Sequence, residues 1–148
     1  MKVSSVVDER ETYRVVTGMT VRELARYMTE RRIGAVAVLD HDRLVGVVSE
    51  RDIMSKVVAK GLDPDNVKIE DVMTREIVVA AGDESYDDAL RKMSQAGIRH
   101  LPVVEGDRLI GMVSQRDLLQ VDLSAKDDEI RWLNAYIHFI LPGREGTS

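Results

Sequence analysis

Two short segments of the sequence carry the same polar pattern, Ser49-Glu50-Arg51-Asp52 and Ser114-Gln115-Arg116-Asp117. A carboxylate can accept hydrogen bonds from both hydroxyls of a ribose, and a serine hydroxyl can donate to a phosphate or sugar oxygen. A guanidinium supplies the positive charge that a phosphate requires. This combination indicates recognition of a ribonucleotide, with the candidate residues Ser49, Arg51, Asp52, Ser114, Arg116 and Asp117.

The same pattern has a purely structural interpretation. A serine followed three positions later by an acidic residue is a common helix N-terminus, and the arginine between them can pair with a surface carboxylate. Duplication does not separate the two interpretations, because a duplicated helix start is still a helix start. The residues alone therefore leave nucleotide binding and helix capping open at both segments.

Both segments belong to a longer internal repeat. Residues 33–52 align without a gap onto residues 98–117 at an offset of 65, and ten of these 20 positions are identical. Several other positions exchange one aliphatic residue for another, as at Val45 and Ile110, so the two copies fill similar core space. The chain therefore contains a duplicated structural unit.

Each copy is predicted to run strand, helix, strand, strand, helix. Short strands are expected at 15–16 and 77–79, after the similar segments 3–7 and 69–73. Apolar residues at three- and four-residue steps predict helices over 20–32 and 85–97. Hairpins are expected from 36–39 into 44–48 and from 101–104 into 109–113. Helices capped by Ser49 and Ser114 should then reach about residues 59 and 121.

These elements predict an α/β (α+β) fold built from two tandem β-α-β-β-α repeats plus a C-terminal helix. We expect the first repeat at 1–60, a linker rich in turn-forming residues at 61–67, the second repeat at 68–122, and the helix and tail at 123–148. Ser124 should open the last helix with a capping box, and Pro142-Gly143 should stop it. Its two apolar stripes, Ile130-Leu133-Ile137-Ile140 and Trp132-Tyr136-Phe139, cannot both face one small core.

The repeated segments resemble the CBS (cystathionine β-synthase) domain family, whose copies pair into a Bateman module. The resemblance rests on Gly46–Asp52 and Gly111–Asp117, each after an apolar strand, and on the Leu-Pro-Val-Val run at 101–104; it covers about residues 1–122. It implies that the copies pack through their strands and leave two clefts related by pseudo-twofold symmetry. In this family a cleft can hold AMP, ADP, ATP or S-adenosylmethionine, and paired modules usually dimerise.

The resemblance also implies a role for polar residues just before the proline of the second copy. Arg99 and His100 stand there, ahead of Pro102, and would approach phosphates from across a cleft. The first copy has Gly34-Ala35-Val36-Ala37 instead, so the two clefts need not be equivalent. Which aspartate shares a cleft with Arg99 and His100 stays open, although Asp52 with this pair would give the fullest polar set.

Composition excludes several other classes. A net charge of −5 with interleaved signs argues against a nucleic-acid surface, and the absence of cysteine rules out disulfides and thiolate chemistry. No apolar run reaches membrane-spanning length, so a cytoplasmic protein is expected. We expect no metal cofactor, because the three histidines lack a second ligand at metal spacing. Phosphate-loop, nucleophile-elbow and helix-borne histidine-pair motifs are absent, so we expect no catalysis.

Two functional hypotheses follow. The first is a regulatory module that senses an adenine nucleotide or S-adenosylmethionine, forms a homodimer through the last helix, and signals to an effector protein outside this chain. The second is an adaptor that dimerises or docks through the same helix without any ligand. A response to ligand separates the two.

Overall fold

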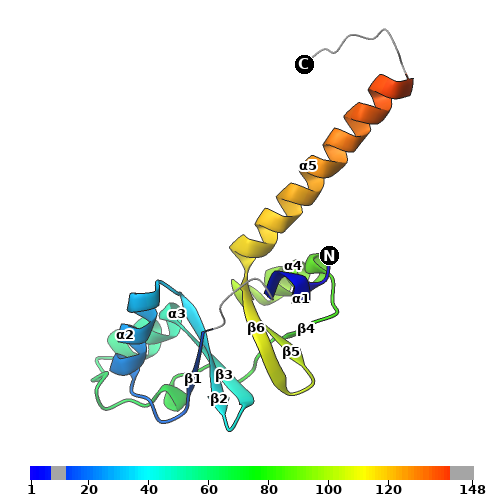
Figure 1. Ribbon diagram of the computed structural model, residues 1–148. Coiled ribbons are helices and arrows are strands. Elements are labelled where there is room, and N and C mark those ends of the chain that lie inside the picture. The colour runs from blue at the N-terminus through cyan, green and yellow to red at the C-terminus, as the bar shows by residue number, and fades with distance from the viewer. Residues whose placement is uncertain (8–12, 141–148) are drawn as a thin grey trace.

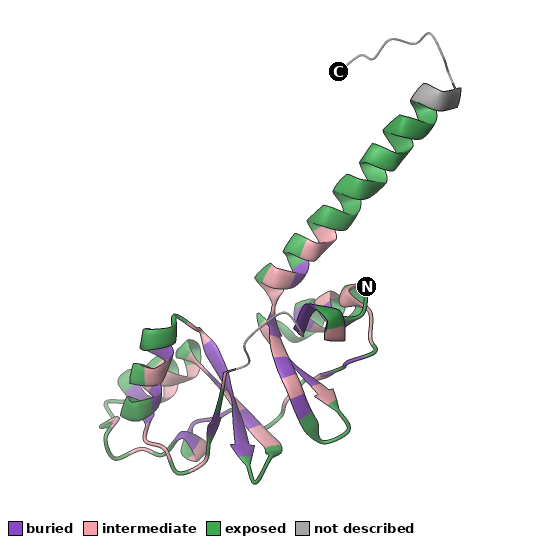
Figure 2. Cartoon of the chain, in the orientation of Figure 1, coloured by how far each residue is buried: buried purple, intermediate pink, exposed green. Residues whose placement is uncertain are grey.

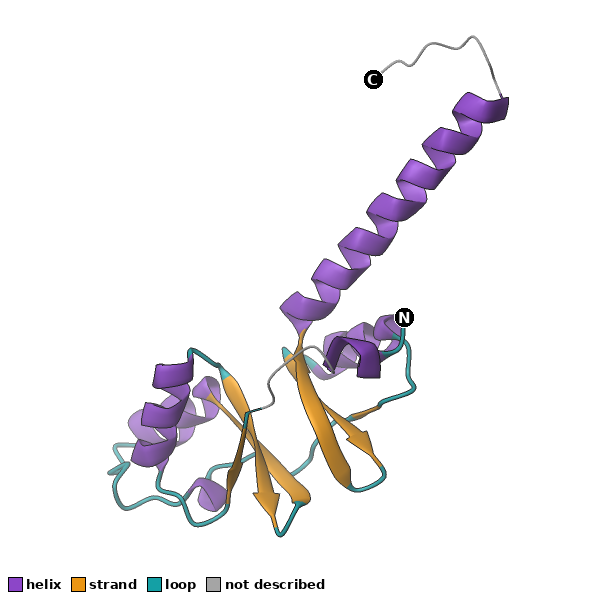
Figure 3. Cartoon of the chain, in the orientation of Figure 1, coloured by secondary structure: helices purple, strands orange, loops and turns teal. Residues whose placement is uncertain are grey.

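The computed structural model describes residues 1–7 and 13–140, and side chains in the last helix as far as residue 137. Its strands form one six-stranded sheet in the order β1-β2-β3-β6-β5-β4, with helices packed on both halves (Figures 1 and 3). The strands are β1 Arg14–Val16, β2 Ala35–Asp40, β3 Arg43–Ser49, β4 Ala80–Ala81, β5 His100–Glu105 and β6 Arg108–Ser114. The helices and helical turns are α1 Val3–Val7, α2 Val21–Arg31, α3 Glu50–Ile53, η1 Met54–Val58, η2 Ile69–Asp71, α4 Tyr86–Ala96 and α5 Gln115–Ile140.

The two halves of the sheet repeat one topology at the predicted offset of 65 residues. In the first half β1 pairs parallel with β2 and places Val15 opposite Val38, while β2 pairs antiparallel with β3. In the second half β4 pairs parallel with β5 and places Ala80 opposite Val103, while β5 pairs antiparallel with β6. The α/β fold with two related repeats, both hairpins and the helices at 20–32 and 85–97 are therefore confirmed.

The first strand of the second repeat lies later than predicted. The expected strand at 77–79 has no regular structure, and β4 occupies Ala80–Ala81, 65 residues after Val15 and Val16. The apolar run at 77–79 suggested a strand, but parallel pairing with β5 begins only at Ala80. Residues 77–79 are thereby left outside the sheet.

The helices of the two repeats begin and end in matching ways. The Thr20 side chain accepts a hydrogen bond from the Glu23 amide at the start of α2, and Ser85 does the same for Asp88 in α4, each at 3.2 Å. Both helices end in a residue with left-handed backbone, Arg32 after α2 and Gly97 after α4. The cap on α3 is also as predicted, since Ser49 and Asp52 form a full capping box.

The segments that begin the two repeats each pack on the half formed by the other repeat. The Val3 amide of α1 donates to the Glu84 carbonyl at 2.8 Å in the second repeat, and the Ile69 amide of η2 donates to the Met19 carbonyl at 2.9 Å in the first. Val3 and Ile69 are completely buried in these exchanged positions. Each repeat core is therefore closed by a segment that belongs, in sequence, to the other repeat.

A third, smaller cluster joins the two cores. Ala37, Leu39 and Leu109 are buried where the hairpins meet, although β3 and β6 are paired only at Arg43 and Arg108. Among the described residues, no polar or charged residue is buried, and Figure 2 shows where the buried residues lie along the chain. Burial of apolar surface rather than strand pairing therefore holds the repeats together.

The C-terminal segment differs from the prediction. Residues 115–140 form one continuous helix, α5, with no break at residue 122 and no cap at Ser124. The segment contains neither glycine nor proline, and Asp122 accepts hydrogen bonds from Tyr86 Oη at 3.2 Å and from Lys126 Nζ at 2.9 Å. These bonds stabilise the helix where a break was expected.

The helix α5 projects away from the rest of the protein (Figures 1 and 2). The predicted stop at Pro142-Gly143 and the side chains of Phe139 and Ile140 lie outside the described residues. The described members of its two apolar stripes are all exposed: Ile130, Trp132, Leu133, Tyr136 and Ile137.

Candidate functional site

A cleft of about 790 Å³ lies between the two repeats, and we call it the first cleft. The N-terminus of α3 contributes Ser49, Arg51 and Asp52 to its wall. The start of β5 and the residues before it contribute the rest of the predicted polar set from the other repeat: Arg99, His100 and Pro102. The structure therefore brings Asp52 into one cavity with Arg99 and His100, and a second cleft brings Asp117 together with the same two residues.

The carboxylate of Asp52 is fully engaged by protein donors. Its Oδ2 accepts from the Ser49 amide at 2.9 Å and from Ser49 Oγ at 3.1 Å. Its Oδ1 accepts from Thr74 Oγ1 at 3.3 Å and from Lys56 Nζ at 3.0 Å. A carboxylate offers about four lone-pair sites, so a ribose hydroxyl would have to displace one of these donors.

A second cleft of about 820 Å³ contains the corresponding residues of the second repeat, Ser114, Arg116 and Asp117. Asp117 Oδ2 accepts hydrogen bonds from both the amide and the Oγ of Ser114. Asp117 and Ser114 therefore hold the start of α5 as Asp52 and Ser49 hold the start of α3. Helix capping at both segments is thus established, and it leaves these side chains on cleft walls.

Arg99 and His100 line the second cleft as well as the first. Their counterparts Gly34 and Ala35 also border both clefts, so these four residues lie on the boundary between the two cavities. Pro102 lines only the first. Arg99 and His100 therefore present polar side chains to both cavities. The first repeat has no equivalent of this pair, because glycine and alanine carry no polar side-chain atoms.

Burial lowers the pKa of His100 below its ordinary value of 6.5, because a desolvated imidazolium is disfavoured. Arg99 lowers this pKa further, whereas Glu50 and Asp117 partly offset the shift. The imidazole is therefore neutral at pH 7. Neutral His100 can either donate or accept a hydrogen bond in the clefts.

Both clefts include residues that the sequence patterns did not single out. The first contains an apolar strip formed mainly by the irregular segment before β4, with Ile77, Val78 and Met54, beside the polar Thr74 and Glu76. The second contains Tyr13, Arg32 and two residues of α5, Leu119 and Leu123. The offset of 65 pairs Tyr13 with Val78 and Met54 with Leu119, so duplication was the signal that could have found them.

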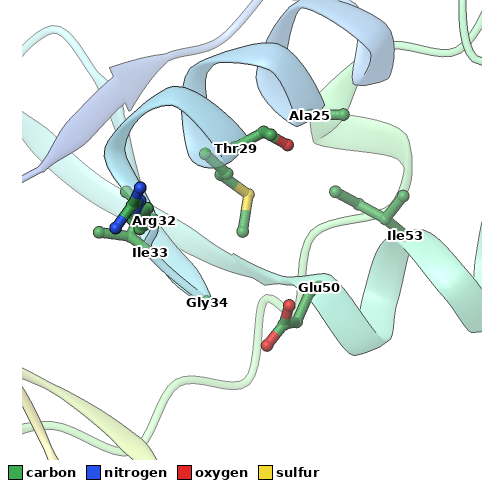
Figure 4. Close-up of a pocket in the computed structure, with 8 residues that line it drawn as sticks. Ala25, Thr29, Arg32, Ile33, Gly34, Glu50 and Ile53 are labelled. Carbon is green, nitrogen blue, oxygen red and sulfur yellow. The ribbon is translucent and has the colours of Figure 1, made fainter.

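A smaller cavity of about 380 Å³ lies between α2 and α3 (Figure 4). Figure 4 shows Arg32 and Ile33 together at the end of α2, with Glu50 across the cavity at the start of α3. The cavity shares Glu50 with the first cleft and Arg32 with the second. It is about half the volume of either cleft.

Among the described residues, no three histidine, cysteine or carboxylate side chains cluster in a way that could hold a metal ion. Within the same residues, no helix combines the length and apolar character that a membrane span requires.

Comparison with known proteins identifies related chains. The model of the CBS domain family matches residues 5–59 and 69–124. An uncharacterised protein from Methanopyrus kandleri is 37% identical over 113 residues, which are 73% of this chain and 58% of that protein. The chain therefore spans less than two thirds of the length of this relative.

Two solved structures with bound ligands are similar to most of this chain. The CBS domain protein PAE2072 from Pyrobaculum aerophilum, complexed with AMP, is 29% identical with a TM-score of 0.72, covering 79% of this chain and 89% of that one. The CBS domain pair of protein MJ0100, in complex with 5′-methylthioadenosine and S-adenosyl-L-methionine, is 26% identical with a TM-score of 0.74, covering 84% and 98%.

Proposed function

The chain belongs to the CBS-domain family, and from this premise we propose that it is a regulatory, non-catalytic module that binds an adenine nucleotide in the clefts between its repeats. The observation that carries the proposal is the first cleft, where the predicted polar residues of both repeats meet in one cavity. The AMP complex of PAE2072 and the adenosine-ligand complex of MJ0100 support the same ligand class.

In the first cleft, the chemistry of the walls suits the parts of a nucleotide. The guanidinium groups of Arg51 and Arg99 suit a phosphate, and Ser49 Oγ, whose one hydrogen is donated to Asp52, can accept a hydrogen bond from a sugar hydroxyl. Val78 and Met54 are 37% and 60% exposed, so they offer apolar surface to a planar base. The cleft's volume of about 790 Å³ lies within the range of small-molecule sites.

The position of Asp52 adds a condition on ribose binding. A cis-diol can replace Thr74 or Lys56 as the donor to Oδ1 while the Ser49 bonds to Oδ2 stay in place. Binding then exchanges one hydrogen bond for another, which gives selectivity between ribose and deoxyribose at modest net affinity.

The regulatory step is a change in how the repeats sit against each other. A ligand that contacts both repeats favours the orientation in which its contacts are complete, provided that its affinity differs between orientations. The helix α5 starts at the second cleft and contributes Leu119 and Leu123 to its wall, so its direction depends on that cleft. Beyond the cleft, its exposed apolar residues are available to a partner.

The partner we propose is a second copy of the chain. Leu119, Leu123, Ile130, Leu133 and Ile137 follow one another at steps of four, seven, three and four residues, the spacing of a coiled-coil seam. A twofold axis would let each α5 cover the apolar seam of its partner. An effector protein would then read the geometry of the dimer.

One alternative function has a specific observation in its favour. Asp52 and Asp117 already accept hydrogen bonds from their capping serines, and the lone pairs of Asp52 are all in use. A ligand-free adaptor that uses only α5 is consistent with such satisfied carboxylates. Binding measurements distinguish it from the nucleotide sensor.

Isothermal titration calorimetry with AMP, adenosine and GMP tests the proposal on wild type, Arg51→Ala and Arg26→Ala. Arg26 is an exposed residue of α2 outside the clefts, so its variant removes the same charge away from the site. We expect AMP binding that weakens about tenfold in Arg51→Ala, as loss of a charged hydrogen bond predicts, and is unchanged in Arg26→Ala. Absence of heat with all three compounds would favour the adaptor.

A further inference from the structure

The two clefts carry different charges. Among the described residues that line the first cleft, two arginines accompany three carboxylates: Arg51, Arg99, Glu50, Asp52 and Glu76. Among those that line the second, three arginines accompany one carboxylate: Arg32, Arg99, Arg116 and Asp117. The counts give −1 for the first lining (two minus three) and +2 for the second (three minus one). The described linings of the two clefts therefore carry formal charges of opposite sign.

Arg32 has a left-handed backbone conformation, and the equivalent position in the second repeat is occupied by a glycine. It follows α2 with φ of 54°, and the equivalent residue after α4 is Gly97 with φ of 67°. Left-handed backbone is unfavourable for a residue with a Cβ, and an added Cβ at Gly97 would have nothing within 4 Å. Glycine is therefore favoured at position 97 by the left-handed backbone and not by a lack of space. Arg32 adopts the same backbone conformation although it carries a Cβ.

A disfavoured conformation retained at a cavity points to a role for the side chain. Arg32 lines the second cleft together with Arg99 and Arg116. None of the three guanidinium groups has an ion pair among the described residues, so their donors are available. Figure 4 shows Arg32 at the end of α2, on the far side of the small cavity from Glu50.

We infer that the second cleft binds the polyphosphate of a nucleoside di- or triphosphate through Arg32, Arg99 and Arg116, and that the first cleft takes adenosine compounds with at most one phosphate. The inference rests on the proposed function and assigns ligand classes to its two cavities. Three guanidinium groups can each present paired donors to phosphate oxygens. In the first cleft, Glu50 and Glu76 repel additional phosphates.

The test is calorimetric titration of ATP, AMP and inorganic tripolyphosphate in magnesium-free buffer, on wild type, Arg32→Gly and Arg26→Ala. Glycine suits the left-handed position after α2, so Arg32→Gly removes the cation without loss of fold, which a thermal melt verifies. We expect Arg32→Gly to weaken ATP and tripolyphosphate about tenfold and to leave AMP within about twofold of wild type. The charge-matched Arg26→Ala should leave all three ligands unchanged.

Equal ATP and tripolyphosphate affinities in wild type and Arg32→Gly would overturn the inference, and retained AMP binding would show that the proposed function survives. Tripolyphosphate binding that depends on Arg32 and is not competed by any adenosine compound would uphold the polyphosphate site while the proposed function fails. No binding of any of the three probes would overturn both.

Discussion

Lys56 Nζ lies 3.0 Å from Asp52 Oδ1, whereas the position equivalent to Lys56 in the second repeat is Val121. The same ammonium donates to the Val72 carbonyl at 2.8 Å, so Lys56 joins α3 and η1 to the segment that leads into the second repeat. A ligand that binds Asp52 therefore competes with a side chain that holds this segment against the core of the first half. This competition links ribose binding in the first cleft to the position of the segment that leads toward β4.

Removal of the competing ammonium should favour the ligand. In Lys56→Met, Asp52 Oδ1 keeps only the Thr74 donor, so a ribose hydroxyl can bind without displacing a partner. We expect adenosine, measured by calorimetry, to bind about fivefold tighter, which corresponds to about 1 kcal/mol for one hydrogen bond. The exposed Lys60→Met is the matched control and should bind as wild type does. Weaker adenosine binding in Lys56→Met would show that Lys56 itself holds the ligand.

Gly46 sets the position of the segment that lines the first cleft. A Cβ at Gly46 would lie 2.4 Å from Met73 Sδ and 2.8 Å from Met73 Cγ. The next residues, Val47 and Thr74, form a bridge with amide to carbonyl distances of 3.1 and 2.9 Å. Gly46→Ala should therefore push Met73 and Thr74 outward, lower the free energy of unfolding by about 1–3 kcal/mol and weaken AMP binding.

Urea denaturation and calorimetry measure these two effects. Gly97→Ala is the contrasting variant, because its cost comes from left-handed backbone and it should lose about 1 kcal/mol. Equal AMP affinity in Gly46→Ala and wild type would contradict the proposed role of residues 74–78.

The lowered pKa of His100 makes stability depend on pH. In the unfolded chain the imidazole titrates near 6.5, and in the folded protein it stays neutral to lower pH. Below about pH 6.5 the unfolded state therefore binds more protons than the folded state. The free energy of unfolding decreases as the pH is lowered, until the pH reaches the pKa of His100 in the folded protein. Urea denaturation at a series of pH values should show this loss in wild type and a smaller one in His100→Gln.

A bound phosphate should shift the same pKa upward, because a nearby anion favours the imidazolium. NMR titration of the His100 ring, with and without AMP, measures the change. A free-protein pKa at or above 6.5, or one that AMP does not move, would contradict the placement of His100 beside both clefts.

The seam along α5 predicts the oligomeric state. Leu133 is 43% exposed and central in the seam, whereas Ala135 lies on the opposite face of the helix. Leu133→Lys should convert a dimer into a monomer, and Ala135→Lys, which adds the same charge, should leave the dimer intact. Sedimentation velocity at micromolar concentration measures both. A wild-type mass of one chain would exclude the proposed seam.

Sequence patterns predicted those features that depend on local chemistry or on duplication. The Ser49 cap, the hairpins and the two amphipathic helices follow from short-range patterns, and all are confirmed. The capping pattern at Ser124 predicted a new helix start there, but residues 115–140 contain no glycine or proline and form one continuous helix. The strand at 77–79 was wrong because an apolar run cannot distinguish a paired strand from a cleft wall.

The features that sequence could not predict arise from tertiary packing. The exchange of the segments that begin the repeats brings Thr74 to Asp52, and nothing near either residue in sequence indicates it. The hydrogen bond that completes the coordination of the Asp52 carboxylate depends on that exchange. The lowered pKa of His100 depends on the burial of its side chain. Arg32 is distinguished by a left-handed φ that its counterpart Gly97 shares, and this backbone conformation has no signature in the sequence around Arg32.

Photo-crosslinking with 8-azido-AMP, followed by mass spectrometry of the labelled peptides, tests most directly whether the nucleotide lies between the repeats. We predict labelling within residues 47–54, 74–78 or 97–102, which line the first cleft, and its suppression by excess AMP but not by GMP. Labelling confined to α5 beyond Leu123, or labelling that excess AMP does not suppress, would contradict nucleotide binding between the repeats.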